Sequence, residues 1–218
     1  MSEVDTAPLH VAVFDYGAGN LHSLVKALEA GGATVRVDTD AARAVVDTDA
    51  VVLPGVGAFA PAAERLASGR EAMRDALLGG LPALGICLGM QLFFDGSDEG
   101  PGAGLGIVPG QVQKLTAARI PQIGWNGLSD VSEPLLREAQ MAVAYYANSF
   151  VGRPTANGLP YVTAWSEHEG DRFPAAVRRA NVVGTQFHPE KSSAPGVAFV
   201  KAFLNMARAR RYGSRSST

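Results

Sequence analysis

The sequence predicts an α/β protein built on a three-layer, doubly wound and mostly parallel sheet with antiparallel additions. In the first half, short apolar runs alternate with segments whose apolar residues recur at helical spacing, which is the pattern of parallel strands joined by helices. In the second half the runs are shorter and separated by turn residues, so we expect mostly antiparallel additions and edges on the same sheet. Of the 218 residues, 47% are hydrophobic and 18% charged, which suits one soluble domain with a full core.

The first strand is expected over residues 10–15, an apolar run that ends at the glycine-rich turn 16–20. Asn20 is a suitable N-cap for the helix that follows, and Gly31 with its neighbouring glycine ends that helix. Its apolar residues recur at helical spacing, at Leu21, Leu24, Val25 and Leu28. A phosphate-binding loop at the glycines is the weaker interpretation, because Ser23 stands where the third glycine of G-x-G-x-x-G belongs.

Two further strands are expected over residues 34–37 and 50–53. The second leads into Pro54-Gly55-Val56-Gly57, whose glycines free the backbone to direct N–H groups into a ligand crevice, although a plain strand-to-helix turn is an equal alternative. A helix is then expected over residues 60–78, ended by the glycines at 79 and 80. Its core-facing residues are Leu66, Met73, Leu77 and Leu78.

The second half begins with a loop over residues 95–106, which is rich in glycine, aspartate and proline. Strand-like runs follow at residues 111–115, 122–125, 141–150, 161–165, 175–179 and 182–187. The last element is a helix over residues 197–209 with one apolar face made of Val197, Val200, Phe203 and Leu204. We expect residues 1–218 to form one domain with flexible tails at about 1–8 and 211–218, and the basic residues from 208 to 215 to be a frayed end.

The stretch Gly85-Ile86-Cys87-Leu88-Gly89 is the centre of the functional prediction. It joins an apolar run at 81–84, suited to a buried strand, to residues 90–94, which continue as a helix. Glycines on both sides of a nucleophile permit a tight strand-to-helix turn, as in the G-x-S-x-G elbow, here with cysteine. A helix N-terminus favours the thiolate and offers free N–H groups to a developing oxyanion. A lone cysteine is otherwise more often a small buried residue of the core.

A second motif supplies the missing members of a catalytic unit. In Gln186-Phe187-His188-Pro189-Glu190 the histidine and the glutamate lie two residues apart, so in extended geometry they share a face at the end of a strand. A histidine oriented by a carboxylate is a general base that can take a thiol proton. Alone such a pair is weak evidence, but with a cysteine on an elbow it completes a Cys–His–Glu triad.

Composition excludes several other classes of function. Nineteen basic residues against 21 acidic ones give a net charge of -2, which provides no electrostatic basis for a nucleic-acid or anionic-membrane partner. The single cysteine excludes an intramolecular disulfide and a cysteine-only metal site, and fits a reducing cytoplasm. No apolar run approaches the ~20 residues of a membrane span, and residues 1–8 do not form a signal peptide. We expect no cofactor and no metal.

The two motifs together resemble the class I (triad) glutamine amidotransferases, which hydrolyse glutamine to glutamate and ammonia. The similarity covers nearly the whole chain and implies the fold of that family. Carried over residue by residue, it implies that Cys87 is the nucleophile, His188 the general base and Glu190 the group that orients the base.

The resemblance also implies the groups that surround the reacting atoms. The amides of Gly57 and Leu88 would form the oxyanion hole, and Gln91 would help to bind the substrate glutamine. Asn148 and Ser149 would line the substrate site as well. The family usually has histidine where Asn148 stands, and because both side chains can donate a hydrogen bond we expect function to survive.

Three further stretches resemble the glutaminase subunits of imidazole glycerol phosphate synthases: residues 15–20, 121–126 and 190–193. This resemblance implies a heterodimer with a (β/α)8-barrel cyclase subunit, with Asn20, Asn126 and Lys191 near the interface or the ammonia gate.

Two alternatives remain. A glutaminase subunit of anthranilate or carbamoyl phosphate synthesis would leave residues 121–126 and 191–193 unexplained. A catalytically silent binding module would need a broken triad, whereas all three members are present.

Overall fold

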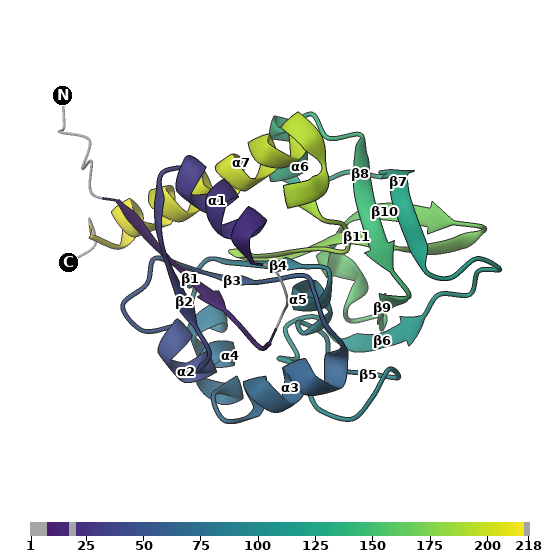
Figure 1. Ribbon diagram of the computed structural model, residues 1–218, viewed down its shortest axis with the longest axis horizontal. Helices are drawn as coiled ribbons and strands as arrows, with labels where there is room; N and C mark the ends of the chain where they lie inside the picture. Colours follow the sequence, from purple (N-terminus) through teal and green to yellow (C-terminus); the bar gives the residue numbers. More distant parts are fainter. Residues whose placement is uncertain (1–7, 18–20, 216–218) are drawn as a thin grey trace.

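A seven-stranded sheet runs through the centre of the computed structural model, which describes residues 8–17 and 21–215, with side chains to residue 211 (Figure 1). Five neighbouring strands are parallel, and two antiparallel strands extend the sheet on one side. In spatial order the strands are β10 (Val162–His168), β11 (Asp171–Arg179), β12 (Val182–Thr185), β4 (Ala83–Ile86), β3 (Ala50–Leu53), β1 (Leu9–Phe14) and β2 (Ala33–Asp38). The α/β prediction is therefore confirmed.

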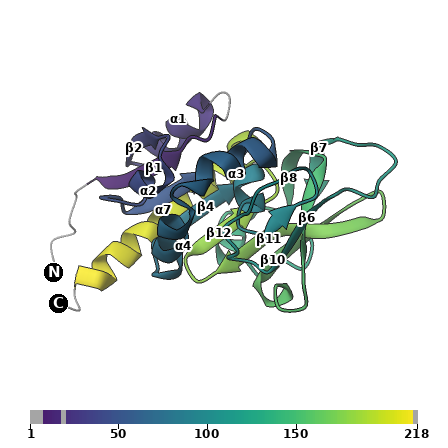
Figure 2. The same ribbon diagram turned by 90° about the horizontal axis from the view of Figure 1, so that it is seen from below.

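Helices cover both faces of this sheet and make the three layers (Figures 1 and 2). On one face lie α1 (His22–Ala30), α6 (Pro134–Glu138) and α7 (Ser193–Arg215), which share a hydrophobic cluster with β1 and β3. On the other face lie α2 (Ala41–Ala44), α3 (Phe59–Ala67) and α4 (Arg70–Leu78), which belong to a second cluster. Strands β3, β4 and β12 are buried along their whole length because side chains on both faces meet helices.

The helix expected over residues 60–78 is instead two helices, α3 and α4, separated at Ser68 and Gly69. A Cβ atom added to Gly69 would lie 2.3 Å from the backbone nitrogen of Ala42, so α2 packs directly against this break. Helix α2 was not predicted because four residues give no periodicity. Leu78 is 41% exposed, so its assignment to the core is wrong, whereas Leu66, Met73 and Leu77 are buried.

The second half departs further from the prediction. Only β10 and β11 extend the central sheet as antiparallel strands. The run expected over 182–187 becomes β12, which is parallel to β4 inside the central sheet and not an antiparallel addition. The remaining segments form a sheet of β5 (Gly96–Ser97), β6 (Gly110–Lys114) and β9 (Phe150–Pro154), and a hairpin of β7 (Gln122–Gly127) with β8 (Val143–Asn148). The single run expected over 141–150 is divided at Ser149, where the chain passes from one small sheet to the other. Helix α6 was also missed.

Helix α7 is longer than expected and runs to Arg215. Val197 is 56% exposed, so the predicted face is wrong at this position, while Val200, Phe203 and Leu204 are buried. The frayed basic end is also not observed, because Arg208 donates to the carbonyl groups of Gly31 and Gly32 and Arg211 to the Asp49 carboxylate. The remaining parts of the expected tails, 1–7 and 216–218, lie outside the described residues.

Helix α1 begins one residue later than the sequence suggested, with Leu21 at the N-cap position. The predicted N-cap, Asn20, lies outside the described residues. Among the helices of residues 8–17 and 21–215, none is long and apolar enough to cross a membrane.

Candidate active site

The turn between β4 and the short helix α5 (Leu88–Gln91) places Cys87 at the carboxyl end of a central strand. Its backbone has φ 47° and ψ -103°, a conformation that non-glycine residues rarely adopt and that is common at functional turns. The flanking glycine at 89 is required by packing, because an added Cβ would lie 2.0 Å from the carbonyl oxygen of Leu53. The strand–turn–helix elbow is thus present, although β4 lies two residues later than expected and α5 ends at Gln91 instead of reaching Phe94.

His188 reaches the cysteine because β12 lies beside β4, with Thr185 opposite Ile86. The strand ends at Thr185, earlier than predicted, and the chain then forms the 3-10 turn η2 (Pro189–Lys191). Within this turn the Nδ1 atom of His188 lies 2.8 Å from Oε1 of Glu190. The pairing expected from extended geometry is therefore made by a tight turn.

The hydrogen bonds of His188 set its charge. Burial lowers its pKa, but hydrogen bonds with Cys87 and with Glu190, together with the negative charges of both, outweigh this effect and raise the pKa from 6.5 to about 9. The imidazolium form therefore dominates at neutral pH, beside the cysteine sulfur. A cation next to the sulfur stabilises the thiolate, which is the nucleophilic form of cysteine.

A cavity of about 270 Å³ opens in front of Cys87. The turn at residues 55–57, which follows β3, forms one wall, and Gly55 lies so close to His188 that an added Cβ would be 2.9 Å from its Cε1 atom. Gly57 has φ +123° and lies against the side chain of Leu88. Leu88 is the first residue of α5, so its N–H has no acceptor within the helix. The cavity also contains Gln91, Ser149, Glu99 and Lys191.

Asn148 presents an unused acceptor at this cavity. The residue is buried, and its Nδ2 atom donates to the carbonyl oxygen of Phe150 at 3.2 Å. Its Oδ1 atom is buried and has no hydrogen-bond partner among the described residues. An ammonium or amide group in the cavity could satisfy it. Neighbouring Ser149 also lines the cavity.

Two residues that have no role in the sequence-based prediction also contact the site. The Nε2 atom of buried Gln186 lies 3.4 Å from Sγ of Cys87. The hydroxyl group of buried Tyr16 donates to the carbonyl oxygen of Pro54, at the start of the glycine turn. Burial first, and then the charges of Cys87 and Asp15, raise the pKa of Tyr16 well above its ordinary value, so it remains a neutral donor. Only their positions beside Cys87 and Pro54, known after folding, distinguish these residues.

Of the three residues expected at an interface, the structure describes Lys191 and Asn126. Lys191 is exposed at the rim of the cavity. Asn126 lies on β7, where its Nδ2 atom donates to the carbonyl oxygen of Glu167 at 2.8 Å. Asn20 lies outside the described residues.

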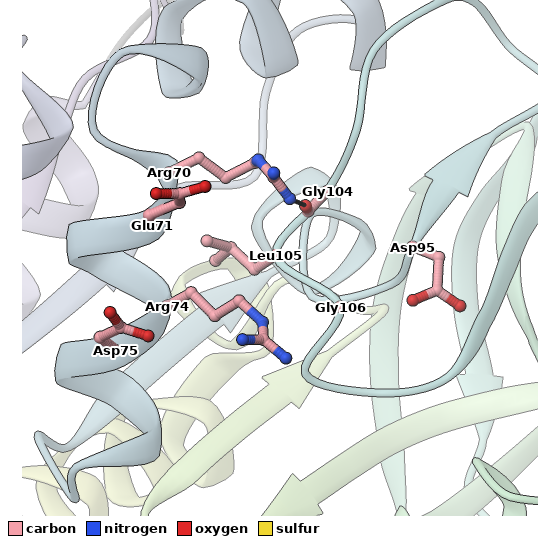
Figure 3. A pocket seen from close by; sticks show the side chains of 8 residues that line it. All are labelled: Arg70, Glu71, Arg74, Asp75, Asp95, Gly104, Leu105 and Gly106. Atoms are coloured by element: carbon pink, nitrogen blue, oxygen red, sulfur yellow. Dashed lines mark hydrogen bonds between the residues drawn. The ribbon is translucent and has the colours of Figure 1, made fainter.

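A larger hollow of about 430 Å³ lies elsewhere, between α4 and the loop that follows α5 (Figure 3). Arg70 and Arg74 reach from α4 toward this loop, and Arg70 donates to the carbonyl oxygen of Gly104 at 3.4 Å. Its lining carries charges of both signs and has no cysteine or histidine. The smaller cavity at Cys87 is therefore the candidate active site, since its lining holds both a cysteine and a histidine.

Comparison with known proteins identifies the family. The family model "Glutamine amidotransferase class-I" matches residues 12–206. "Imidazole glycerol phosphate synthase subunit HisH" of Deinococcus radiodurans is 44% identical over 211 residues, which cover 92% of this chain and 94% of that protein. The protein of the same name from a strain of Thermus thermophilus is 43% identical over 205 residues, which cover 92% of this chain and 96% of that protein. Among solved structures, a putative GMP synthase protein from Thermoplasma acidophilum is similar in fold, with a TM-score of 0.75, 18% identity and coverage of 96% and 98%.

Proposed function

The chain belongs to the class I glutamine amidotransferases and, within them, to the HisH subunits of imidazole glycerol phosphate synthase, and from this we propose that Cys87, His188 and Glu190 carry out its glutaminase reaction. The observation that supports these roles is the Cys87 elbow facing an imidazole that is hydrogen-bonded to Glu190. Residues from distant parts of the sequence meet here with the geometry of one catalytic unit.

The reaction proceeds in two steps. The thiolate sulfur of Cys87 attacks the side-chain amide carbon of glutamine, and the C–N bond breaks while the His188 imidazolium gives its proton to the leaving ammonia. Neutral His188 then takes a proton from water, whose oxygen attacks the thioester carbon. The C–S bond breaks, glutamate leaves and the thiolate–imidazolium pair is restored. During both steps the N–H groups of Gly57 and Leu88 stabilise the oxyanion.

The ammonia serves a cyclase partner. In this proposal a (β/α)8-barrel subunit uses it to make imidazole glycerol phosphate and the aminoimidazole carboxamide ribonucleotide, in histidine biosynthesis in the cytoplasm. An exposed apolar face of the β7–β8 hairpin supports a partner on this side, because Trp125 and Val143 are 54% and 50% exposed. The face adjoins the active site, since the carbonyl oxygen of Tyr145, opposite Trp125, accepts from the His188 amide at 2.8 Å.

Measuring glutamate release tests the proposal. The chain is assayed alone, and then with the barrel subunit and its ribonucleotide substrate. We expect slow hydrolysis by the chain alone and a rise of ~100-fold or more in the complex, because ammonia made without an acceptor is lost and a peptide rotation at Gly57 can supply or withdraw one oxyanion donor. Full turnover by the isolated chain, or no rise with partner and substrate, would contradict it. Activation by an anthranilate synthase partner instead would favour the alternative assignment.

A further inference from the structure

Two buried glutamine side chains form a short hydrogen-bonded series behind the nucleophile. Gln91 and Gln186 come from α5 and from the segment that follows β12. The Nε2 atom of Gln91 donates to the carbonyl oxygen of Phe150 at 2.9 Å and to Oε1 of Gln186 at 3.3 Å. The Nε2 atom of Gln186 then lies 3.4 Å from Sγ of Cys87. Both side chains are buried, so the series is shielded from bulk water.

The direction of this series is fixed at its far end. A backbone carbonyl group can only accept, so the Gln91 side chain must turn its NH₂ group toward Phe150. The second hydrogen of that NH₂ group then meets the oxygen of the Gln186 amide. This contact in turn leaves the Gln186 NH₂ group facing the sulfur. Rotating the Gln91 amide by 180° would place two acceptors against each other, and rotating the Gln186 amide would place two donors against each other, in both cases at a buried contact.

We propose that Gln186 is a second hydrogen-bond donor to the reacting sulfur of Cys87, held in its donating orientation by Gln91 and the carbonyl group of Phe150. The sulfur thus receives one donor from His188 and another from Gln186. Because a donor stabilises a charged acceptor more than a neutral one, this arrangement increases the thiolate fraction. The consequence for catalysis rests on the proposed function; the effect on the thiolate does not.

In the glutaminase reaction the donor matters most when the sulfur leaves. As the C–S bond of the thioester breaks, its electron pair passes to the sulfur, and the Gln186 N–H lies beside the atom on which this charge appears. The same series changes the role expected of Gln91. Its NH₂ hydrogens are both engaged by protein groups, so it orients Gln186 and can offer only its Oε1 atom to a substrate.

Alkylation of the chain by iodoacetamide tests the proposal directly, because Cys87 is the only cysteine and every alkylated thiol reports on it. The rate is measured from pH 5 to 10 for the full wild-type chain, Gln186→Met and Gln186→Glu, with Gln113→Met as an exposed control on β6. Methionine matches glutamine in length but cannot donate. The other titratable side chains near the sulfur, namely Tyr16, Glu99, His188, Glu190 and Lys191, are unchanged in every variant.

We expect Gln186→Met to move the midpoint of the alkylation rate upward by about one pH unit, which is about tenfold slower alkylation below the midpoint. Gln186→Glu should move it at least as far, because an ionised carboxylate repels a thiolate. Gln113→Met should match the wild type. The midpoint is the decisive readout, because it reports the balance between thiol and thiolate, whereas the maximum rate also depends on how easily the reagent reaches the sulfur.

If either Gln186→Met or Gln186→Glu folds and its alkylation rate has the wild-type midpoint, the proposal is overturned. Glutamate release by the same variants in the cyclase complex is then measured against pH. A shifted alkylation midpoint in the variants, together with a wild-type chain that releases no glutamate in the complex, would contradict the proposed function while supporting the role of Gln186. A shifted midpoint with kcat reduced about tenfold and KM unchanged would support both.

Discussion

Replacing Glu190 by glutamine should move the alkaline limit of glutaminase activity to lower pH. The change preserves the shape of the side chain, and its amide oxygen can still accept from Nδ1 of His188, where the carboxylate oxygen now lies at 2.8 Å. What is lost is the negative charge beside the imidazolium. The variant therefore separates the orienting role of Glu190 from its electrostatic role.

The size of the effect follows from the charge state of His188. Burial lowers the pKa of this side chain, while hydrogen bonds and charges from Cys87 and then Glu190 raise it, with a net change from 6.5 to about 9. That change corresponds to roughly 3 kcal/mol in favour of the imidazolium. Removing one opposite charge in contact typically lowers a histidine pKa by about one unit or more.

The sign of the pH dependence is determined by which form is active. The imidazolium donates the proton to leaving ammonia, and it is present below its pKa, so wild-type kcat/KM should persist to about pH 9 and fall above it. In Glu190→Gln the fall should begin at least about one pH unit lower, so kcat/KM above pH 9 should be about tenfold below the wild-type value, with a smaller change at neutral pH, where His188 stays mostly protonated. The stability that His188 contributes follows the same order: it is complete below pH 6.5 and is lost as pH rises through about 9.

The assay is kcat/KM for glutamate release by the cyclase complex from pH 5.5 to 10.5. Glu138→Gln, which removes an exposed carboxylate on α6, is the matched control and should leave the profile unchanged. An unshifted alkaline limb in Glu190→Gln would refute the electrostatic argument, even if the overall rate were lower. An equal shift in both variants would show that only net charge matters.

Three further substitutions test other parts of the site. Cys87→Ala should reduce glutamine hydrolysis more than ~100-fold while the complex still uses added ammonium salts, and retained hydrolysis would exclude the thioester mechanism. Gly89→Ala should lower the free energy of unfolding, measured in urea, by about 3 kcal/mol, because the added Cβ would lie 2.0 Å from the Leu53 carbonyl oxygen. In the control Gly127→Ala the added Cβ has no atom within 4 Å, so the free energy of unfolding should fall by about 1 kcal/mol or less. Asn148→Leu should raise the KM for glutamine about tenfold with a smaller change in kcat, and an unchanged KM would remove its unpaired Oδ1 atom from substrate binding.

The part of the fold that the sequence predicts well is the part where local signals and burial agree. Strand β3 was expected at residues 50–53 and found there, because a four-residue apolar run between turn residues has one favourable place, between two layers of helix. The division of residues 60–78 into α3 and α4 was not foreseen. Gly69 alone would only weaken a helix, and the break is made by α2 packing on it, a contact between segments distant in sequence.

The small sheets were mispredicted for a related reason. Short alternating runs such as β7 indicate a strand but carry no information about which strand pairs with it. Residues 143–148 pair with β7, and residues 150–154 pair with β6, so a single apolar run serves two sheets. Only tertiary packing distinguishes this arrangement from an extension of the central sheet.

The candidate site was more predictable than the sheet that carries it, because its chemistry constrains the fold. A thiol nucleophile needs a base within hydrogen-bonding distance, so Cys87 and His188 in one active site require their strands to end at the same edge of the sheet. The structure meets this requirement with β4 and β12 as parallel neighbours, Ile86 opposite Thr185. The position of Gln186 could not be inferred in this way. Its role depends on the amide of Gln91 and the carbonyl group of Phe150, which meet only when α5 and β9 are packed together.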